Sequence, residues 1–112
     1  VANVSTDDVK ELIGQFSEAV ESWKGDESWA RKHADGFIEC GGQKDVAKNG
    51  SQITFHFPFT QKPVVVHSPV ENDDNETSEA VNITSSSFTL VKWDSDQRIK
   101  RSGACTWFAS GF

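Results

Sequence analysis

The first third of the chain has the hydrophobic spacing of an amphipathic helix. Its apolar residues recur at intervals of four, three, four and three, at Val9, Ile13, Phe16, Val20 and Trp23. This alternation is typical of the seam of a coiled coil. Ser5 stands in an N-cap position, Asp8 follows three residues later, and Gly25 is a stop signal. The pattern predicts a helix over about residues 6–24 and a second, shorter helical segment over residues 27–34.

Two interpretations of this stripe stay open. The helix packs against its own domain, or it meets copies of itself, because short helices are marginal in water on their own. Phe16 and Trp23 are bulky for the seam of a two-helix coiled coil and favour a coiled coil of three or four helices. We therefore predict that residues 1–36 form an N-terminal oligomerisation segment and that the protein is a homo-oligomer, either a trimer or a tetramer.

From residue 37 onward the pattern changes to the period of a β-strand. Ile53, Phe55 and Phe57 alternate with the polar residues Thr54 and His56. Turn residues bound six such stretches, which cover residues 37–40, 52–57, 63–70, 79–84, 88–94 and 104–110. Because no helical pattern interrupts them, we predict a mostly β fold. It is a six-stranded antiparallel β-sandwich over residues 37–112, preceded by the amphipathic helix.

Composition and charge narrow the functional classes. The chain has 112 residues and a net charge of -6, which argues against a nucleic-acid partner. Its longest apolar run, residues 64–66, is too short to insert into a membrane. The chain has no Met and carries sequons at Asn3, Asn49, Asn75 and Asn82. Together these features favour a processed, secreted and extracellular protein, with the glycosylation of the sequons left open.

The two cysteines are Cys40 and Cys105, which fall in the first and last predicted strands. We predict that they form a disulfide that ties the ends of the sandwich together. Two cysteines without close spacing do not make a structural metal site, and we expect no metal and no cofactor. The acidic stretch at residues 71–76 offers oxygen ligands that Ca²⁺ could use, although a solvated loop is the preferred interpretation.

Motifs for catalysis are missing from the sequence. It has no HExxH, GxSxG or CxxC motif and no glycine-rich phosphate loop. His33, His56 and His67 are interpreted as structural or surface residues. We therefore predict a binding protein rather than an enzyme, with a sugar-active enzyme that uses two carboxylates as one alternative.

An aromatic residue next to acidic and basic residues marks the C-terminal third. Trp93 and Asp94 end the fifth predicted strand, and Arg98 and Arg101 lie in the polar loop that follows. An indole stacks on the apolar C–H face of a galactose-type ring, and ionic side chains form charge-assisted hydrogen bonds to its hydroxyl groups. This arrangement suits a sugar site. The alternative is that Trp93 belongs to the core and that the arginines pair with Asp94 or Asp96.

The order of aromatic and proline anchors over residues 37–110 resembles the H-type lectin domain. That domain is the galactose- and N-acetylgalactosamine-binding sandwich of snail agglutinins and of the discoidin C-terminal domain. The anchors are Ile53-Thr54-Phe55, Pro58-Phe59, Lys62-Pro63-Val64-Val65-Val66, Phe88-Thr89-Leu90, Trp93-Asp94 and Cys105-Thr106-Trp107-Phe108-Ala109. The resemblance implies a six-stranded sandwich that forms trimers, with sugar sites near the seams between protomers.

The resemblance also implies residue roles. Trp93 matches the ring-contacting Trp of the family, and Asp94 follows it where snail members have a His and many others an acid. The family's Arg on the fourth strand falls near Asn75 or Glu79 here, so Arg98 or Arg101 would replace it. The aromatic that closes the pocket in the family would fall near Arg101 and is absent here, and the acid from the loop after the first strand would be Asp45. The predicted sugar-binding residues are therefore Trp93, Asp94, Arg98, Arg101, Asn75, Glu79 and Asp45.

The function expected from these observations is multivalent recognition of cell-surface glycans. The resemblance implies a secreted agglutinin for galactose- and N-acetylgalactosamine-type glycans, including N-acetyllactosamine-type chains. The alternative is a secreted oligomeric sandwich that recognises a protein partner rather than a sugar.

Overall fold

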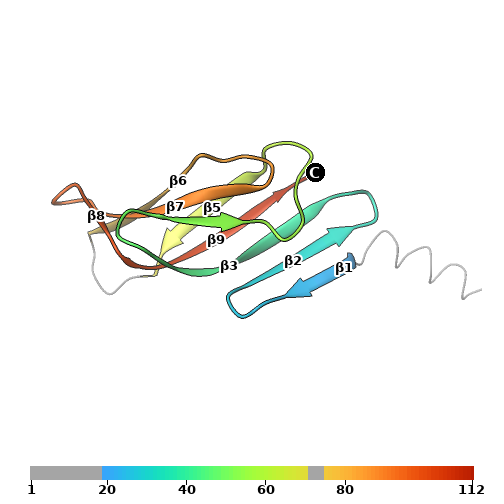
Figure 1. Ribbon diagram of the computed structural model, residues 1–112, viewed down its shortest axis with the longest axis horizontal. Coiled ribbons are helices and arrows are strands. Elements are labelled where there is room, and N and C mark those ends of the chain that lie inside the picture. Colours follow the sequence, from blue (N-terminus) through green and yellow to red (C-terminus); the bar gives the residue numbers. More distant parts are fainter. Residues whose placement is uncertain (1–18, 71–74) are drawn as a thin grey trace, which may run out of the picture.

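A computed structural model of the protein describes residues 19–70 and 75–112, and every regular element within these ranges is a β-strand (Figure 1). The nine strands are β1 Ala19–Lys24, β2 Ser28–His33, β3 Ile38–Val46, β4 Ser51–Thr54, β5 Val64–Pro69, β6 Glu76–Val81, β7 Ser87–Asp94, β8 Ile99–Arg101 and β9 Gly103–Gly111. In this described part of the chain no helix has the length and hydrophobicity that crossing a membrane would need.

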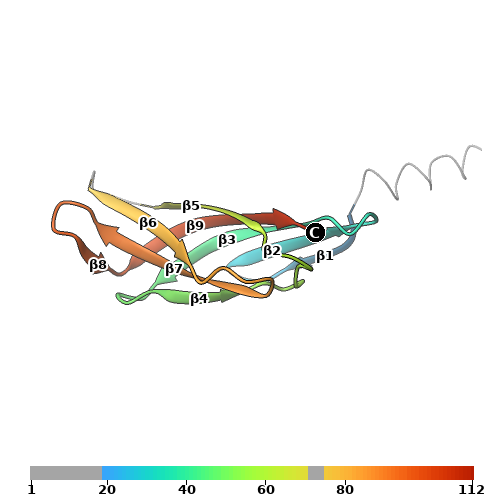
Figure 2. The ribbon, with the colours of Figure 1, turned by 90° about the horizontal axis from the view of Figure 1, so that it is seen from above.

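The strands form two antiparallel sheets that face each other (Figure 2). The larger sheet has the order β1-β2-β3-β9-β5, and the smaller has the order β4-β7-β6, with the short β8 also paired to β7. β6 lies against β5, and β7 lies against β3 and β9. β4 is therefore the edge of the smaller sheet on the side of β1 and β2, and these two strands continue the larger sheet beyond it.

The core lies between the two sheets and is rich in aromatic rings. Phe55 is at its centre, with ring centroids 5.0 Å from Phe59, 5.6 Å from Phe88 and 6.2 Å from Trp107. The remaining members are smaller and come from both sheets: Ala30, Ile38, Cys40, Val46, Ile53, Leu90, Cys105 and Ala109. Burial of these side chains is the main force that holds the two sheets together.

The predicted fold class is confirmed as mostly β with antiparallel sheets. Each of the six predicted strands overlaps an observed one, namely β3, β4, β5, β6, β7 and β9. The described residues contain three further strands, β1, β2 and β8, so the count of six was too low.

The helix predictions are wrong wherever the structure describes the chain. Residues 19–24 form β1, and the segment expected as a second helix forms β2, with Trp23 paired to Ala30 across the hairpin. The hairpin extends the open edge of β3, so its backbone groups are bonded to a neighbouring strand. Trp23 stacks on His56 at a centroid distance of 4.2 Å, and Val20 is exposed. The rest of the expected helix, including Val9, Ile13 and Phe16, lies outside the described residues.

The predicted disulfide is also wrong. Cys40 lies opposite Ala109 in the pairing of β3 with β9, whereas Cys105 lies opposite Lys44, four residues away. Four residues span about 13 Å along a strand, at about 3.3 Å each, and a disulfide needs its Cα atoms within about 7 Å. Both thiols are free and buried. Loss of hydration on burial raises the pKa of Cys40 to about 12, so this thiol stays neutral.

Candidate functional site

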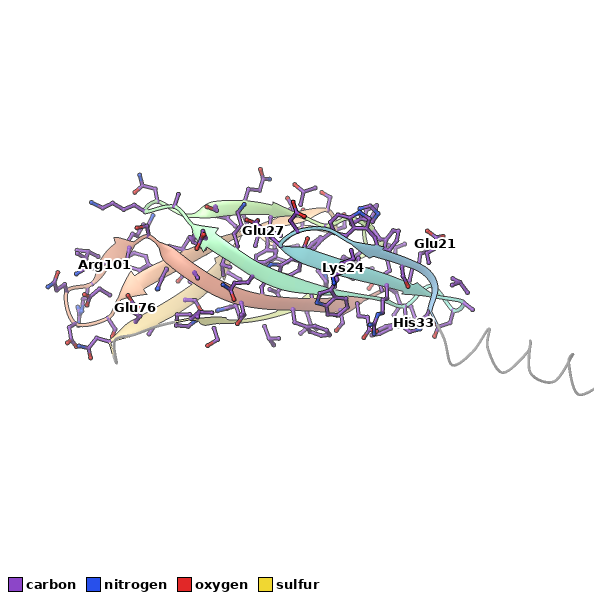
Figure 3. The ribbon with its side chains drawn as sticks, turned by 90° about the horizontal axis from the view of Figure 1, so that it is seen from below. Glu21, Lys24, Glu27, His33, Glu76 and Arg101 are labelled. Atoms are coloured by element: carbon purple, nitrogen blue, oxygen red, sulfur yellow. The ribbon has the colours of Figure 1, made fainter. Side chains whose placement is uncertain are left out.

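An open hollow of about 300 Å³ lies over β6, the end of β7 and the turn that leads to β8. It is lined by Thr77, Ser78, Glu79, Trp93, Asp94, Ser95 and Arg98. Four of the seven residues that sequence analysis predicted to bind sugar therefore lie together here: Glu79, Trp93, Asp94 and Arg98. Figure 3 shows this end of the molecule, where Arg101 and Glu76 are labelled.

Strand alternation places Trp93 on the outer face of the smaller sheet. Along β7, Leu90 and Lys92 are buried, and Trp93 is the next residue, half-buried and outside the core cluster. It pairs with Thr77 of β6 on one side and with Lys100 of β8 on the other. The Lys100 ammonium is 5.6 Å from the centre of an indole ring, within the range of a cation–π contact. Trp93 is thus a supported but accessible aromatic surface.

Asp94 organises the turn next to Trp93. One of its carboxylate oxygens accepts hydrogen bonds from the backbone N–H groups of Asp96 and Gln97, both at 3.1 Å. The other accepts from Nη2 of Arg101 at 2.9 Å. These interactions, led by the Gln97 N–H group, lower the pKa of Asp94 from its ordinary value. Asp94 is therefore an ionised group held in one orientation, and Arg101 is its partner.

Arg98 lines the hollow in an unusual backbone conformation. Its φ is 54°, in the left-handed region that residues other than glycine seldom adopt. The side chain is exposed, and it forms no salt bridge with any residue that the structure describes. Among the two arginines that could replace the family's strand Arg, Arg98 is therefore the one that can reach a ligand.

The other predicted site residues have different positions. Asn75 precedes β6, and its backbone carbonyl accepts hydrogen bonds from the N–H group of Ser95 at 2.7 Å and from its Oγ at 2.8 Å. Asn75 therefore anchors the turn without lining the hollow. Asp45 lies on β3 in the other sheet, exposed and opposite Ala104, and takes no part in this site. Arg101 does not line the hollow; its Nη2 donates to Asp94 at 2.9 Å and to Oε1 of Gln97 at 3.3 Å.

Sequence analysis missed three lining residues, Thr77, Ser78 and Ser95. Thr77 reaches the site because β6 pairs with β7 in the register that sets it opposite Trp93. That register depends on the tertiary structure, and no local pattern around Thr77 signals it. Ser95 directly follows Asp94 and could have been found from this position alone.

A buried ion pair lies on the inner side of the same strands. Lys92 is the neighbour of Trp93 that points into the protein, and its Nζ is 2.9 Å from Oε2 of Glu76 at the start of β6. The two side chains are 5% and 19% exposed. Lys92 also donates to the carbonyl of Val70, at the end of β5, at 3.5 Å. This contact connects the smaller sheet to the larger one beneath the hollow.

Comparison with known proteins shows the fold. No family model and no curated protein matches the sequence. An N-truncated R1-type pyocin tail fiber is similar in structure, with a TM-score of 0.56, 15% identity and full coverage of both chains. An R1 pyocin fiber of P. aeruginosa has a TM-score of 0.56 and 16% identity, over 99% of this chain and 32% of that one. At these identities the likeness concerns the fold alone. The resemblance to H-type lectins stays a prediction.

Proposed function

We propose that this protein is a carbohydrate-binding protein and that the hollow around Trp93 holds the sugar. The observation that supports this proposal most directly is the convergence of one accessible indole with two carboxylates and one arginine in the same open hollow. An aromatic face flanked by a few polar groups with fixed positions is the usual composition of a small-molecule site.

The groups around Trp93 contact different parts of a bound pyranose ring. The indole stacks on the apolar C–H face of the ring, and the Lys100 ammonium lies 5.6 Å from the centre of an indole ring. Glu79 accepts hydrogen bonds from hydroxyl groups, and Arg98 donates to them. Asp94 fixes the turn that carries Arg98 and presents an oriented carboxylate at the edge of the ring. A shallow site of this kind binds with dissociation constants from millimolar to micromolar, which correspond to binding free energies of about -4 to -8 kcal/mol.

The sugar class that we propose is the one implied by the H-type lectin resemblance. It comprises galactose and N-acetylgalactosamine at the ends of cell-surface glycans, including N-acetyllactosamine-type chains. The protein would act outside the cell as a secreted agglutinin.

Self-association would raise the strength of binding. Val64, Val66 and Phe108 are exposed on the outer face of the larger sheet, where Val66 lies opposite Phe108. These side chains offer an apolar surface for contact between copies, in addition to any contribution from Val9, Ile13 and Phe16. Several weak sites that bind at once increase affinity by about 100-fold or more.

The same apolar face also favours a second candidate function, recognition of a protein partner. Val64 is 69% exposed, and such apolar side chains grouped on one surface often mark a protein contact. Free galactose separates the two functions. A lectin loses its binding to cells when galactose is added, whereas a protein-recognition module keeps it.

The proposal is tested by replacing the indole. Trp93→Ala is compared with the native protein on a glycan array and by calorimetric titration with galactosides. The control is Trp29→Ala, which removes an indole from the outer face of the other sheet. There the ring centroids of Trp29 and Phe108 are 6.1 Å apart. We expect Trp93→Ala to weaken binding at least tenfold and the control to bind normally. Retained binding in Trp93→Ala would place the site elsewhere, and an array with no bound glycan would refute the function.

A further inference from the structure

A second, smaller hollow opens between the two sheets beside β4. Its volume is about 160 Å³, and its lining residues are Glu27, Ser28, Gln43, Lys44, Gln52, Ile53, Thr54 and Trp107. It shares no residue with the hollow around Trp93. Figure 3 shows Glu27 near the middle of the molecule, whereas Arg101 and Glu76 lie toward one end. The two hollows are therefore separate sites on one domain.

One wall of this hollow is built by the turn between β1 and β2, and Gly42 lets that turn approach closely. A Cβ atom on Gly42 would collide with the carbonyl oxygen of Glu27 and with Cα of Ser28, so no side chain fits there. The N–H group of Gln43 donates to the same Glu27 carbonyl at 3.0 Å. The turn is thus fixed onto β3, and the position of Glu27 over β3 is set by the backbone.

Oppositely charged groups stand at the mouth of the hollow. Nζ of Lys44 is 3.5 Å from Oε2 of Glu27, and the two side chains are 36% and 59% exposed. At this distance and exposure the pair is loose, and each group can hydrogen-bond to a ligand as well. The two charges cancel, so the mouth favours a neutral polar ligand over an ionic one.

The opposite wall is the free edge of the smaller sheet. β4 ends that sheet, and its far side has no strand partner among the described residues. Backbone N–H and C=O groups on such an edge are available to a ligand. Gln52 and Thr54 line the hollow at this edge, and their side chains alternate with that of the inward-facing Ile53, so β4 presents mainly its backbone groups to the space between the sheets.

The remaining wall is apolar and comes from Trp107 and Ile53, both members of the core. An indole with polar groups around it matches a sugar ring, which has apolar C–H faces and a rim of hydroxyl groups. The volume of about 160 Å³ is well below the range of about 300–1,000 Å³ typical of sites for drug-sized ligands. The space therefore suits one ring.

We propose that this hollow is a second saccharide subsite, which takes a single neutral hexose unit. Glu27 and the backbone carbonyl groups on the free edge of β4 accept hydrogen bonds from hydroxyl groups, Lys44 donates, and the edge of Trp107, which is 7% exposed, contacts the apolar C–H groups. The inference takes its ligand class from the proposed function, but its location is independent of Trp93.

The test is a titration of the full chain with methyl β-galactoside, followed by the NMR signals of the indole N–H groups and of the backbone amides. Single Trp→Phe variants assign the indole signals. We expect saturable shifts at Trp107 and Gln52. Glu27→Ala should weaken the Trp107 titration at least fivefold and leave the Trp93 titration unchanged. The matched control is Asp26→Ala, which removes the neighbouring exposed carboxylate that does not line the hollow and should change neither titration.

The outcomes separate this inference from the proposed function. Shifts at Trp93 with none at Trp107 and Gln52 would overturn the second subsite alone. Shifts at Trp107 that Glu27→Ala weakens, with none at Trp93, would support the second subsite and overturn the proposed location of the first. An absence of shifts at both indoles would overturn both. Equal weakening by Glu27→Ala and Asp26→Ala would also overturn the subsite, because the effect would then be one of general charge.

Discussion

Replacing Glu76 by alanine removes the carboxylate that neutralises the buried ammonium of Lys92. The ion pair has a separation of 2.9 Å, and Lys92 is the one charged residue that is buried among those the structure describes. Removing one partner of a buried pair costs about 3–5 kcal/mol, because the other charge is left without compensation. The carboxylate of Glu76 still has some access to water, and the Val70 carbonyl at 3.5 Å is a poor substitute. We therefore expect the free energy of unfolding to fall by about 3 kcal/mol, near the lower end of this range.

The assay is urea unfolding followed by tryptophan fluorescence. With a slope of about 1.5 kcal/mol per molar urea, a loss of about 3 kcal/mol moves the midpoint down by about 2 M. The control is Glu79→Ala, an exposed carboxylate on the same strand, which should stay within about 0.5 kcal/mol of the native protein.

A double variant tests whether the uncompensated charge of Lys92 causes this loss of stability. Glu76→Leu combined with Lys92→Met replaces both charges with apolar groups of similar size, and such replacements are often neutral or stabilising by about 1–4 kcal/mol. We expect it to recover the stability that Glu76→Ala loses. The reasoning is refuted if Glu76→Ala loses less than about 1 kcal/mol, or if the double variant is as unstable as the single one.

Two further predictions follow from the buried thiols and from Asp94. Thiol titration without reductant should find two reactive cysteines in denatured protein and none in native protein, since both are buried and burial raises their pKa; a denatured sample without free thiols would contradict the register of β3 and β9. The pKa of Asp94 is lowered in the folded protein, so its contribution to the β7–β8 turn is fully present above the ordinary Asp value of 3.8 and is lost as the pH falls through the folded value. We therefore expect the pH titration of the Gln97 amide signal to have its midpoint below 3.8, and we expect this signal to be shifted at neutral pH in Asp94→Asn; a midpoint at or above 3.8 would show that the turn does not hold the carboxylate as described.

The strands of the core could be predicted because burial repeats every second residue. Ile53 and Phe55 are buried and Thr54 and His56 are exposed, and this alternation continues past the end of β4. The N-terminal hairpin gave no such signal. β1 lies beyond the edge of the smaller sheet, and among residues 20–24 only Trp23 packs against the core, so no alternation of buried and exposed residues marks this strand. Without that period, the helical spacing of Val20 and Trp23 predicted a helix over residues 19–24, where the structure has β1.

The candidate site was predictable to the extent that its residues are neighbours in sequence. Trp93, Asp94 and Arg98 belong to one strand end and its turn, so local chemistry was enough to group them. Glu79 was found only through a family resemblance, and Thr77 was not found, because both reach the hollow through the register of β6 with β7. The disulfide prediction was wrong for the same reason, because the register of β3 with β9 offsets Cys40 and Cys105 by four residues along the strands.

The place of β9 in the larger sheet has a consequence for how the chain folds during synthesis. β9 lies between β3 and β5, yet it is the last strand in sequence, and Cys40 meets its partner Ala109 across 69 residues. Until residue 111 has left the ribosome, the larger sheet lacks the strand that joins β3 to β5, and the edges of β3 and β5 that pair with β9 have no partner there. Such long-range pairing makes closure slow and leaves the nascent chain open to aggregation. Folding of the whole sandwich is therefore expected as a single late event after translation of β9.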